Sequence, residues 1–507
     1  MATLNVAMML EHAARTTPDH PFLSGGRERL SYADVDVAAR RFANVLASLG
    51  VTPGERVALL MANCTAFVVC YYGVLKAGAV AVPLHPSSPG PEVAYFLEDS
   101  GASVLIAAGA TAAAATAGFD AVSSCRHLVV DESPDNPERV GGLSLEPLLS
   151  AASADHESWP TVPQDVAVIL YTSGTTGRPK GAKLTHFNVH FFSRLLAGEF
   201  WRLTADDVVL MAAPPAHIFG LAILNVSCAA GARIFLLPRF DVALFLDAVD
   251  AEGVTFFAGV PTLAQHLLRA PLAHGRTLGD VRLVMLGGAA LEPELVQAFR
   301  DRFGVPVITG YGMTEGVPLT YLTEDTMDSA PPGSVGRAAW GTDIAIVDDA
   351  GVAVPAGEPG EIVVRGPQLF DGYHDRPDES ASVWRNGWFR TGDVGRMDGD
   401  GHLFVLDRLK DLIKRSGYSV YPAEIERVLH AHEAVAEAVV VGVSDPMVGE
   451  EVKAFVALRP GRSISADELI RHCRATLASY KVPRLVEFRD ALPRNPTGKL
   501  LRRALRE

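Results

Sequence analysis

The feature that most restricts the fold is a regular alternation of short apolar runs with segments of helical period. Extended runs at 56–61, 79–84 and 103–107 are separated by helical segments at 66–77 and 91–100, and further runs follow at 166–171, 208–212, 233–237, 255–259 and 282–286. Apolar strands linked by helices form parallel sheets with both faces covered. The predicted fold class is therefore α/β. At 507 residues the chain is long enough for two to four structural units.

The pattern changes twice further along the chain. After Glu324, short runs such as 343–347 and 360–365 are broken by Gly, Pro and Asp-Gly turns, which predicts a small antiparallel β unit resembling a barrel. From Arg408 onward, helical segments (423–430, 466–478) mix with strands (435–443, 452–458). We therefore expect a large N-terminal domain of helix-covered sheets plus this β unit, followed by a small α+β domain.

Composition excludes several classes of protein. Hydrophobic residues make up 48% of the chain, which is enough for a large core and excludes a mainly disordered protein. The longest apolar run, 67–75, is about half of a membrane span, so we expect no stable membrane insertion. The five cysteines are scattered without metal-ligand spacing, and the N-terminus does not resemble a signal peptide. These features predict a soluble, cytoplasmic protein.

Charge is unevenly distributed. The net charge of the chain is −14, yet the part from Arg408 onward has 18 Lys and Arg against 13 Asp and Glu, a net +5. This density is too low for a nucleic-acid-binding face, so no nucleic-acid partner is expected. Two explanations of this asymmetry are equally good: chance variation in a solvated surface, and a basic surface that contacts an anionic partner.

The strongest local signal is the segment YTSGTTGRPKG at 171–181, which follows a buried apolar run. It combines three glycines, four Ser and Thr hydroxyls and two cations. Small residues allow backbone N–H groups to approach a phosphate, and hydroxyls and cations complete such a site. The spacing from Gly174 to Lys180 does not fit a Walker A loop. The segment predicts a phosphate-binding loop of another kind.

A second motif, GYGMTEG at 310–316, follows the apolar run 305–309. An aromatic ring between glycines can lie flat against a nucleotide base, which is the role expected for Tyr311. Thr314 can donate to a phosphate oxygen, and Glu315 is a hard oxygen ligand suited to Mg²⁺. A capped turn without any ligand is the alternative for this motif.

Two weaker signals lie further along the chain. Asp393, within GWFRTGD, can accept protons from two ribose hydroxyls, although an Asx turn explains it equally well. Lys499, on the turn PTGK, can neutralise charge that develops on a phosphate. Each is weak alone, and their occurrence in this order with the two stronger motifs gives them weight.

Together these motifs resemble those of the adenylate-forming superfamily, which includes acyl-CoA synthetases, aryl-CoA ligases, acyl-carrier-protein ligases, beetle luciferases and non-ribosomal adenylation domains. The segments YTSGTTGRPKG, GYGMTE, GWFRTGD, DRLKDLIKRSGY and PTGK carry the resemblance, which extends from about residue 30 to 499. It implies ATP and Mg²⁺ as cofactors and a two-step reaction. A carboxylate attacks the α-phosphate of ATP to give an acyl-adenylate and pyrophosphate, and a thiol then displaces AMP.

The resemblance also assigns roles to residues. Thr314 would contact the α-phosphate, Glu315 and Thr175 the Mg²⁺, and Lys499 would bridge the carboxylate and the α-phosphate. The implied ATP site consists of the phosphate loop, the segments that flank adenine and the ribose ligands. Its residues, in that order, are Thr172, Ser173, Gly174, Thr175, Thr176, Gly177 and Lys180, then Gly288, Ala289, Ala290, Gly310, Tyr311, Gly312 and Met313, then Asp393 and Arg408.

The same resemblance implies a moving domain. Adenylation needs fixed cations in a dry site, whereas thiol attack needs an open path, and a swinging domain meets both needs. Lys410 matches the hinge position, and Lys414 would face the thiol in the second step. The expected organisation is an adenylation domain over 1–407, a hinge at 408–411 and a mobile lid domain over 412–507.

The expected acyl pocket is formed by His217, Phe219, Gly310, Gly316 and Val317. Amino-acid-activating relatives place an Asp near His217, and malonate-activating relatives place an Arg where Gly310 stands here; this chain has neither. A neutral fatty or aryl-propenoic acid fits better, with a slight preference for an aliphatic chain. A core histidine without a substrate role is the alternative for His217.

The acceptor is expected to be CoA, with a separate phosphopantetheinylated acyl carrier protein as the alternative. The sequence departs from the family pattern at 84–86, 339–340 and 372–375, and these departures are the reason for keeping the carrier protein as an alternative acceptor. Two other classes of protein are alternatives to the ligase. A luciferase-type oxygenase has no support in the aromatic content of 7%, and Lys499 together with Glu315 argues against a non-catalytic binding protein.

Overall fold

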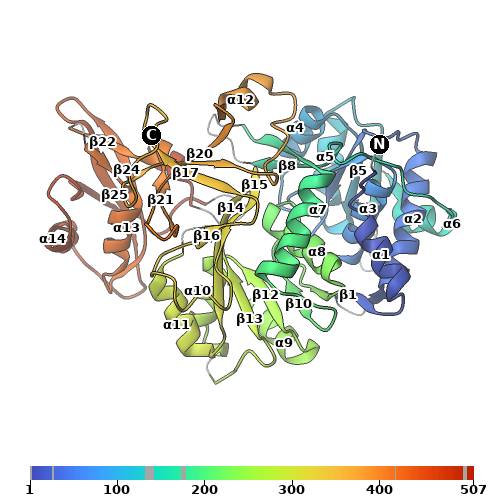
Figure 1. The fold of residues 1–507 in the computed structure, drawn as a ribbon, viewed down its shortest axis with the longest axis horizontal. Coiled ribbons are helices and arrows are strands. Elements are labelled where there is room, and N and C mark those ends of the chain that lie inside the picture. The colour runs from blue at the N-terminus through green and yellow to red at the C-terminus, as the bar shows by residue number, and fades with distance from the viewer. Residues whose placement is uncertain are drawn as a thin grey trace. The chain divides into compact units, whose positions relative to one another are not determined.

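The structure is a computed structural model that describes residues 3–25, 28–131, 142–172, 178–273, 275–289, 291–416, 418–494 and 500–506. The chain forms two compact units (Figure 1). The first comprises Met1–Asp343 and Arg365–Phe389, and the second comprises Ile344–Val364 and Arg390–Glu507. The expected hinge at 408–411 lies inside the second unit, so its role remains a prediction about movement.

A nine-stranded sheet in the first unit has the order β16-β15-β14-β13-β12-β10-β11-β1-β2. Its strands from β10 to β14 run parallel, as the alternating pattern predicted. The nine strands are β1 (Pro21–Gly25), β2 (Glu28–Ser31), β10 (Val208–Met211), β11 (Arg233–Leu236), β12 (Phe256–Gly259), β13 (Leu283–Leu286), β14 (Val307–Met313), β15 (Gly316–Tyr321) and β16 (Arg337–Ala338).

Helices cover both faces of this sheet. On one face, α9 (Val242–Glu252), α10 (Pro261–Arg269) and α11 (Pro293–Phe303) share an apolar core with β10 and β12–β14. The connections through these three helices lead along the sheet toward β14, whereas the connection from β10 to β11 through α8 (Ile218–Ala230) leads the other way. Because crossovers between parallel strands are right-handed, connections in opposite directions lie on opposite faces. Helix α8 therefore covers the other face, beside α7 (His186–Leu195) (Figure 1). This is the doubly covered parallel sheet that the sequence predicted.

A seven-stranded sheet in the same unit has the order β7-β6-β5-β3-β4-β8-β9. Helices α4 (Gly90–Ser100) and α5 (Ala112–Asp120) share its apolar core, whereas α2 (Tyr32–Ser48) packs on α3 (Thr65–Lys76), and α6 (Leu145–Ala151) contacts α2. The strands are β3 (Arg56–Leu60), β4 (Val80–Leu84), β5 (Ala102–Ala108), β6 (His127–Asp131), β7 (Leu143–Ser144), β8 (Val166–Thr172) and β9 (Lys180–Thr185).

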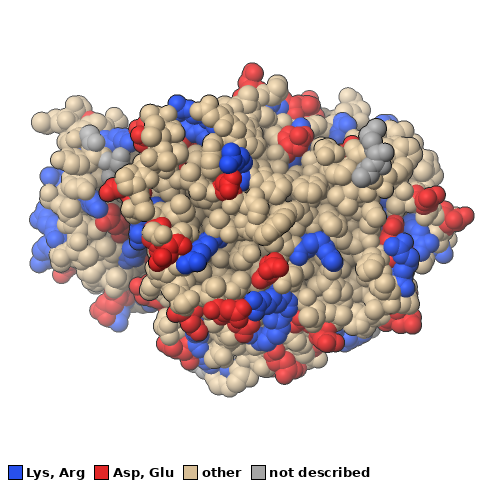
Figure 2. All heavy atoms as spheres, viewed as in Figure 1, with Lys and Arg blue, Asp and Glu red and all other residues tan. Residues whose placement is uncertain are grey.

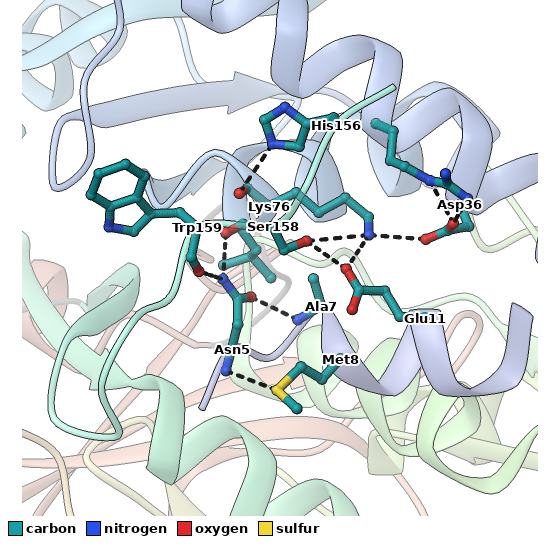
Figure 3. Close-up of polar contacts among 11 residues, drawn as sticks. Asn5, Ala7, Met8, Glu11, Asp36, Lys76, His156, Ser158 and Trp159 are labelled. Carbon is teal, nitrogen blue, oxygen red and sulfur yellow. Dashed lines mark hydrogen bonds and ion pairs between the residues drawn. The ribbon is translucent and has the colours of Figure 1, made fainter. Parts of the chain in front are cut away.

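A buried lysine joins the N-terminal helix α1 (Met8–Thr16) to the body of this unit (Figure 3). Lys76 is only 1% exposed, and its Nζ lies 2.6 Å from Oε1 of Glu11 and 2.9 Å from Oδ1 of Asp36. Its backbone carbonyl accepts a hydrogen bond from the amide of Trp159 at 2.8 Å. A buried ammonium is tolerated only when paired in this way, so the cluster fixes α1 and the segment that leads into β8.

The second unit contains two smaller sheets. Strands β17 (Asp343–Val347), β18 (Gly360–Arg365), β20 (Trp388–Met397) and β21 (Leu403–Arg408) form the predicted β unit. The α+β part has the sheet order β23-β22-β25-β24 with β26 beside β25, and its elements are β22 (Ile413–Arg415), β23 (Tyr418–Val420), α13 (Pro422–His430), β24 (Val435–Asp445), β25 (Gly449–Leu458), α14 (Ala466–Thr476) and β26 (Leu485–Phe488).

One predicted strand boundary was wrong. The apolar run 305–309 was expected to end before the glycine-rich motif, but β14 continues through Gly310 to Met313 because β15 pairs with it. The motif is therefore strand, and only Thr314 and Glu315 form the turn. Among the described residues, no helix is long and apolar enough to cross a bilayer.

Candidate active site

The predicted adenine and acyl residues lie at one edge of the nine-stranded sheet. Parallel strands place their carboxyl ends together, and ligands of α/β proteins bind at that edge. His217 and Phe219 follow β10, Gly288 and Ala289 follow β13, and Tyr311 lies near the end of β14. Gly288 has φ of +79°, a backbone conformation that favours glycine.

The turn between β14 and β15 carries the two residues predicted to act on phosphate and metal. Met313 pairs with Gly316, which leaves Thr314 and Glu315 at the tip. The backbone carbonyl of Glu315 accepts a hydrogen bond from the amide of Phe370 at 2.9 Å, and Glu315 is only 6% exposed. A buried carboxylate needs a partner, and the neighbouring segment supplies one.

Residues 369–374 join the two large sheets. Leu369 bridges Gly316 of β15, and Tyr373 bridges Ala182 of β9, both in antiparallel fashion. The amide of His374 also donates to the carbonyl of Gly181 at 2.8 Å. This segment therefore connects the Thr314–Glu315 turn of one sheet to the start of β9, where the predicted phosphate ligand Lys180 lies.

Tyr373 contacts both charged residues at this junction. Its hydroxyl donates to Oε1 of Glu315 at 2.8 Å, and Nζ of Lys180 lies 5.4 Å from the centre of its ring. Burial lowers the pKa of the Lys180 ammonium, an effect opposed by Glu315 and reinforced by Arg376. Tyr373 was not predicted as a site residue. The only signal in the sequence was the unusual Tyr-His pair at 373–374, which was noted as a departure from the family pattern.

Lys180 also forms an ion pair with Glu379 of helix α12 (Pro377–Ser382), which is followed by the short strand β19 (Trp384–Arg385). The Lys180 side chain is 13% exposed, so the pair is partly shielded from water. Lys180 lies directly opposite Thr172 in the β8–β9 ladder, which brings two predicted phosphate ligands together. Glu379 was not singled out from the sequence.

Several predicted site residues lie outside the described part of the chain. They are Ser173, Gly174, Thr175, Thr176, Gly177, Ala290 and Lys499. Their roles remain those that the family resemblance implies.

In the second unit, the two predicted ribose ligands are neighbours. Asp393 of β20 and Arg408 of β21 face each other across the ladder, with Nε of Arg408 2.9 Å from Oδ1 of Asp393. The Asp393 side chain is buried, whereas the Arg408 side chain is partly exposed. The ion pair holds the Asp393 carboxylate in a fixed orientation, as a ligand for two hydroxyls requires.

The predicted hinge and thiol-facing residues also lie in the second unit. Lys410 is part of a single 3-10 turn, Leu409–Asp411, and its carbonyl accepts a hydrogen bond from Arg506 at 3.2 Å. Lys414 is exposed on β22, and its amide donates to Oε2 of Glu450 at 2.6 Å. Both residues thus lie on short elements whose backbone is held by a hydrogen bond to the side chain of another residue.

The predicted acyl-pocket residues differ in their surroundings. His217 precedes α8 and is exposed, so the alternative of a core histidine does not apply. Phe219 and Val317 are half-buried, and a Cβ on Gly316 would lie 2.7 Å from Leu369. A Cβ on Gly310 would lie 2.6 Å from the carbonyl oxygen of Thr320. A larger residue at 310 would therefore disrupt the β14–β15 pair.

The residues present fit a magnesium ion. Mg²⁺ is commonly held by one or two carboxylates plus substrate phosphates, so a single buried carboxylate such as Glu315, near the predicted phosphate ligand Lys180, suits it. No cluster of three or more His, Cys, Asp or Glu residues suited to a metal occurs within the described ranges.

Comparison with known proteins identifies the class. The AMP-binding enzyme profile matches residues 10–374, and the profile of the AMP-binding enzyme C-terminal domain matches residues 424–499. A feruloyl-CoA synthase of Amycolatopsis sp is 37% identical over 501 residues, 97% of this chain and 96% of that protein. A long-chain-fatty-acid–CoA ligase of Mycobacterium tuberculosis is 36% identical over 511 residues, 99% of this chain and 98% of that protein.

Among solved structures, ATP-bound MatB from Rhodopseudomonas palustris has a TM-score of 0.88 and 32% identity, covering 99% of this chain and 98% of that one. The chain belongs to the AMP-binding enzymes of the adenylate-forming superfamily. It is an AMP-forming acid–thiol ligase that uses ATP and acts as an acyl- or aryl-CoA ligase through an adenylate. The predicted family, fold class and enzyme class are thereby confirmed.

Proposed function

We propose that this ligase activates a monocarboxylic acid with an uncharged tail, a fatty acid in the first place, and transfers the acyl group to CoA. The observation that carries the proposal is the absence of charge along the expected pocket. Helix α8 and strand β15, both fully described, contain no Asp, Glu, Lys or Arg. A second carboxylate or an ammonium on the substrate would be left unpaired there, at a cost of several kcal/mol.

ATP and Mg²⁺ have assigned positions in this proposal. Tyr311 stacks on adenine beside Gly288, Asp393 and Arg408 hold the ribose, and Lys180 binds the terminal phosphates. Glu315 would hold the Mg²⁺, and Thr314 would donate to the α-phosphate. A bound Mg²⁺ would supply positive charge where negative charge develops at phosphorus, and Lys499 would add a cation at the α-phosphate.

The organisation into steps is also part of the proposal. Residues 408–411 act as the hinge between the adenylation domain (1–407) and the lid domain (412–507), and Lys414 faces the thiol in the second step. Supporting this, Lys410 lies in a single turn between β21 and β22 rather than inside a long element.

CoA is proposed as the acceptor because the similar proteins are named as CoA ligases. A basic lid domain suits a phosphate-bearing acceptor of either kind. On the face drawn in Figure 2, however, basic groups in the part coloured orange to red in Figure 1 alternate with acidic ones. The net +5 therefore does not form a continuous basic surface on that face.

The five cysteines are all unpaired, which favours the cytoplasm.

An aryl-propenoic acid is the second candidate substrate, because the feruloyl-CoA synthase is as similar to this chain as the fatty-acid ligase. The test is ATP–pyrophosphate exchange with fatty acids of graded length, ferulate, coumarate, malonate and glycine, followed by thioester formation with CoA or a phosphopantetheinylated carrier protein. We expect exchange with fatty acids and thioester formation with CoA. Preferred activation of malonate or glycine would refute the uncharged pocket, and transfer only to the carrier protein would refute CoA as acceptor.

A further inference from the structure

One helix, α4, holds both ends of the connection between β8 and β9. At the first end, the hydroxyl of Tyr171 donates to Oδ2 of Asp99 at 2.9 Å. At the other end, the hydroxyl of Tyr95 donates to the backbone carbonyl of Pro179 at 2.7 Å. Tyr95 and Asp99 are one helical turn apart, so they lie on the same side of α4. The last pair of the ladder lies between these contacts and joins Thr172 to Lys180.

The Asp99 carboxylate is the centre of this arrangement. Its side chain is 8% exposed, and its Oδ1 lies 2.5 Å from Nη2 of Arg376. The Tyr95 hydroxyl also lies 3.4 Å from the same oxygen. Burial raises the pKa of Tyr171 well above its ordinary value, and the charge of Asp99 raises it further, so Tyr171 remains a neutral donor. A buried carboxylate is stable only with such partners, which means that Asp99 fixes their positions.

We propose that Asp99 is a positioning residue for the phosphate-binding loop: it sets the spacing of the two loop ends and thereby the placement of Lys180. This inference rests on the proposed function, in which the loop holds the β- and γ-phosphates of ATP. Asp99 does not touch the nucleotide; it acts through Tyr171 and through Tyr95. Displacements of about 1 Å in such supports can cost about a hundredfold in rate.

A positioning role for Asp99 predicts different effects on the binding of ATP and of AMP. Loss of the Asp99 carboxylate should weaken ATP, which needs the loop for its terminal phosphates, far more than AMP, which has no such phosphates. A residue that merely stabilised α4 would affect both nucleotides alike. The difference between ATP and AMP therefore separates positioning from folding.

The experiment measures the dissociation constants of ATP and AMP by calorimetry for the wild-type enzyme, Asp99→Ala, Asp99→Asn and Tyr171→Phe. Glu98→Ala, an exposed neighbour on the same helix, is the matched control. We expect Asp99→Ala to weaken ATP about tenfold or more and AMP by less than twofold. Asp99→Asn still accepts a hydrogen bond from Tyr171 and should recover part of the loss, and Glu98→Ala should match the wild type.

Equal weakening of ATP and AMP by Asp99→Ala, or unchanged ATP binding, would overturn the inference. Tyr171→Phe guards against a misfolded Asp99 variant, because it removes one hydroxyl and should show the same ATP-specific loss to a smaller degree. The proposed function fails separately: a wild-type enzyme that binds ATP but exchanges pyrophosphate with no acid would refute the function, while the nucleotide comparison would still decide the role of Asp99.

Discussion

The hydroxyl of Tyr373 donates to the carboxylate of Glu315 across 2.8 Å, between the segment 369–374 and the turn of the β14–β15 hairpin. The same ring faces the ammonium of Lys180. The proposed metal ligand and the proposed phosphate ligand are thus aligned through one aromatic side chain. Groups that orient a metal ligand typically contribute about 10- to 100-fold to metal affinity or activity.

Tyr373→Phe should weaken the use of Mg²⁺. The variant keeps the ring beside Lys180 and loses only the hydrogen bond that orients Glu315. We expect the Mg²⁺ concentration for half-maximal pyrophosphate exchange to rise about tenfold. Tyr373→Leu, which also loses the ring, should be more severe. An unchanged Mg²⁺ dependence in Tyr373→Phe would mean that Glu315 does not bind the metal through the orientation seen here.

Glu379→Gln should improve ATP binding. Glu379 pairs with Lys180, and the pair competes with phosphate for the ammonium. A partly exposed ion pair is worth up to about 1 kcal/mol, so we expect the KM for ATP to fall about two- to fivefold. Glu379→Asp retains the charge and serves as the control. A higher KM for ATP in Glu379→Gln would show instead that Glu379 holds Lys180 in its working position.

Lys410→Pro should separate the two half-reactions. Proline fixes φ and removes an N–H, so the proposed hinge would be restricted to one orientation. We expect pyrophosphate exchange within a few fold of the wild type and thioester formation lowered by tenfold or more. Lys410→Ala, which leaves the backbone free to turn, should retain both steps. Normal thioester turnover in Lys410→Pro would place the pivot elsewhere.

Acid should destabilise the first unit through His186. This residue is 0% exposed, its Nδ1 accepts a hydrogen bond from the amide of Val6 at 3.1 Å, and burial lowers its pKa from 6.5 to about 4. The folded state thus excludes a proton that the unfolded state binds. Stability is complete above pH 6.5 and falls by about 3 kcal/mol as the pH drops toward 4.

Chemical denaturation of the wild type and His186→Asn at several pH values checks this. The variant should be less stable at pH 7 but should lose less stability between pH 6.5 and 4. His12→Asn, which changes an exposed histidine of α1, is the control and should follow the wild type. Parallel pH curves for wild type and His186→Asn would contradict the assignment.

Local signals predicted most elements well. Helix α2 carries such signals at both ends: a capping box between Ser31 and Asp34 begins it, and Gly50, just beyond its end, has φ of +75°. The extent of β14 was missed because a glycine-rich motif resembles a turn until its antiparallel partner is known. Pairing between strands is a non-local property, and a single run of residues does not contain it.

The same reason explains the missed site residues. Motifs and family resemblance indicated Glu315 and Lys180, but Tyr373 is brought to them by backbone bridges to two sheets whose strands are distant in sequence. Asp99 belongs to an ordinary amphipathic helix, where a carboxylate is usually solvated, and only the fold reveals its buried partners. Residues that support a site through other residues leave little trace in a single sequence.

The most direct test of the central claim is the fate of a carboxylate oxygen. The enzyme is incubated with ATP, CoA and a fatty acid labelled with ¹⁸O in its carboxylate, and the products are analysed by mass spectrometry. With both carboxylate oxygens labelled, attack on the α-phosphate followed by thiol displacement predicts that AMP and acyl-CoA each carry one ¹⁸O atom and that pyrophosphate is unlabelled. Label in inorganic phosphate with formation of ADP, or AMP without label, would contradict an acyl-adenylate route.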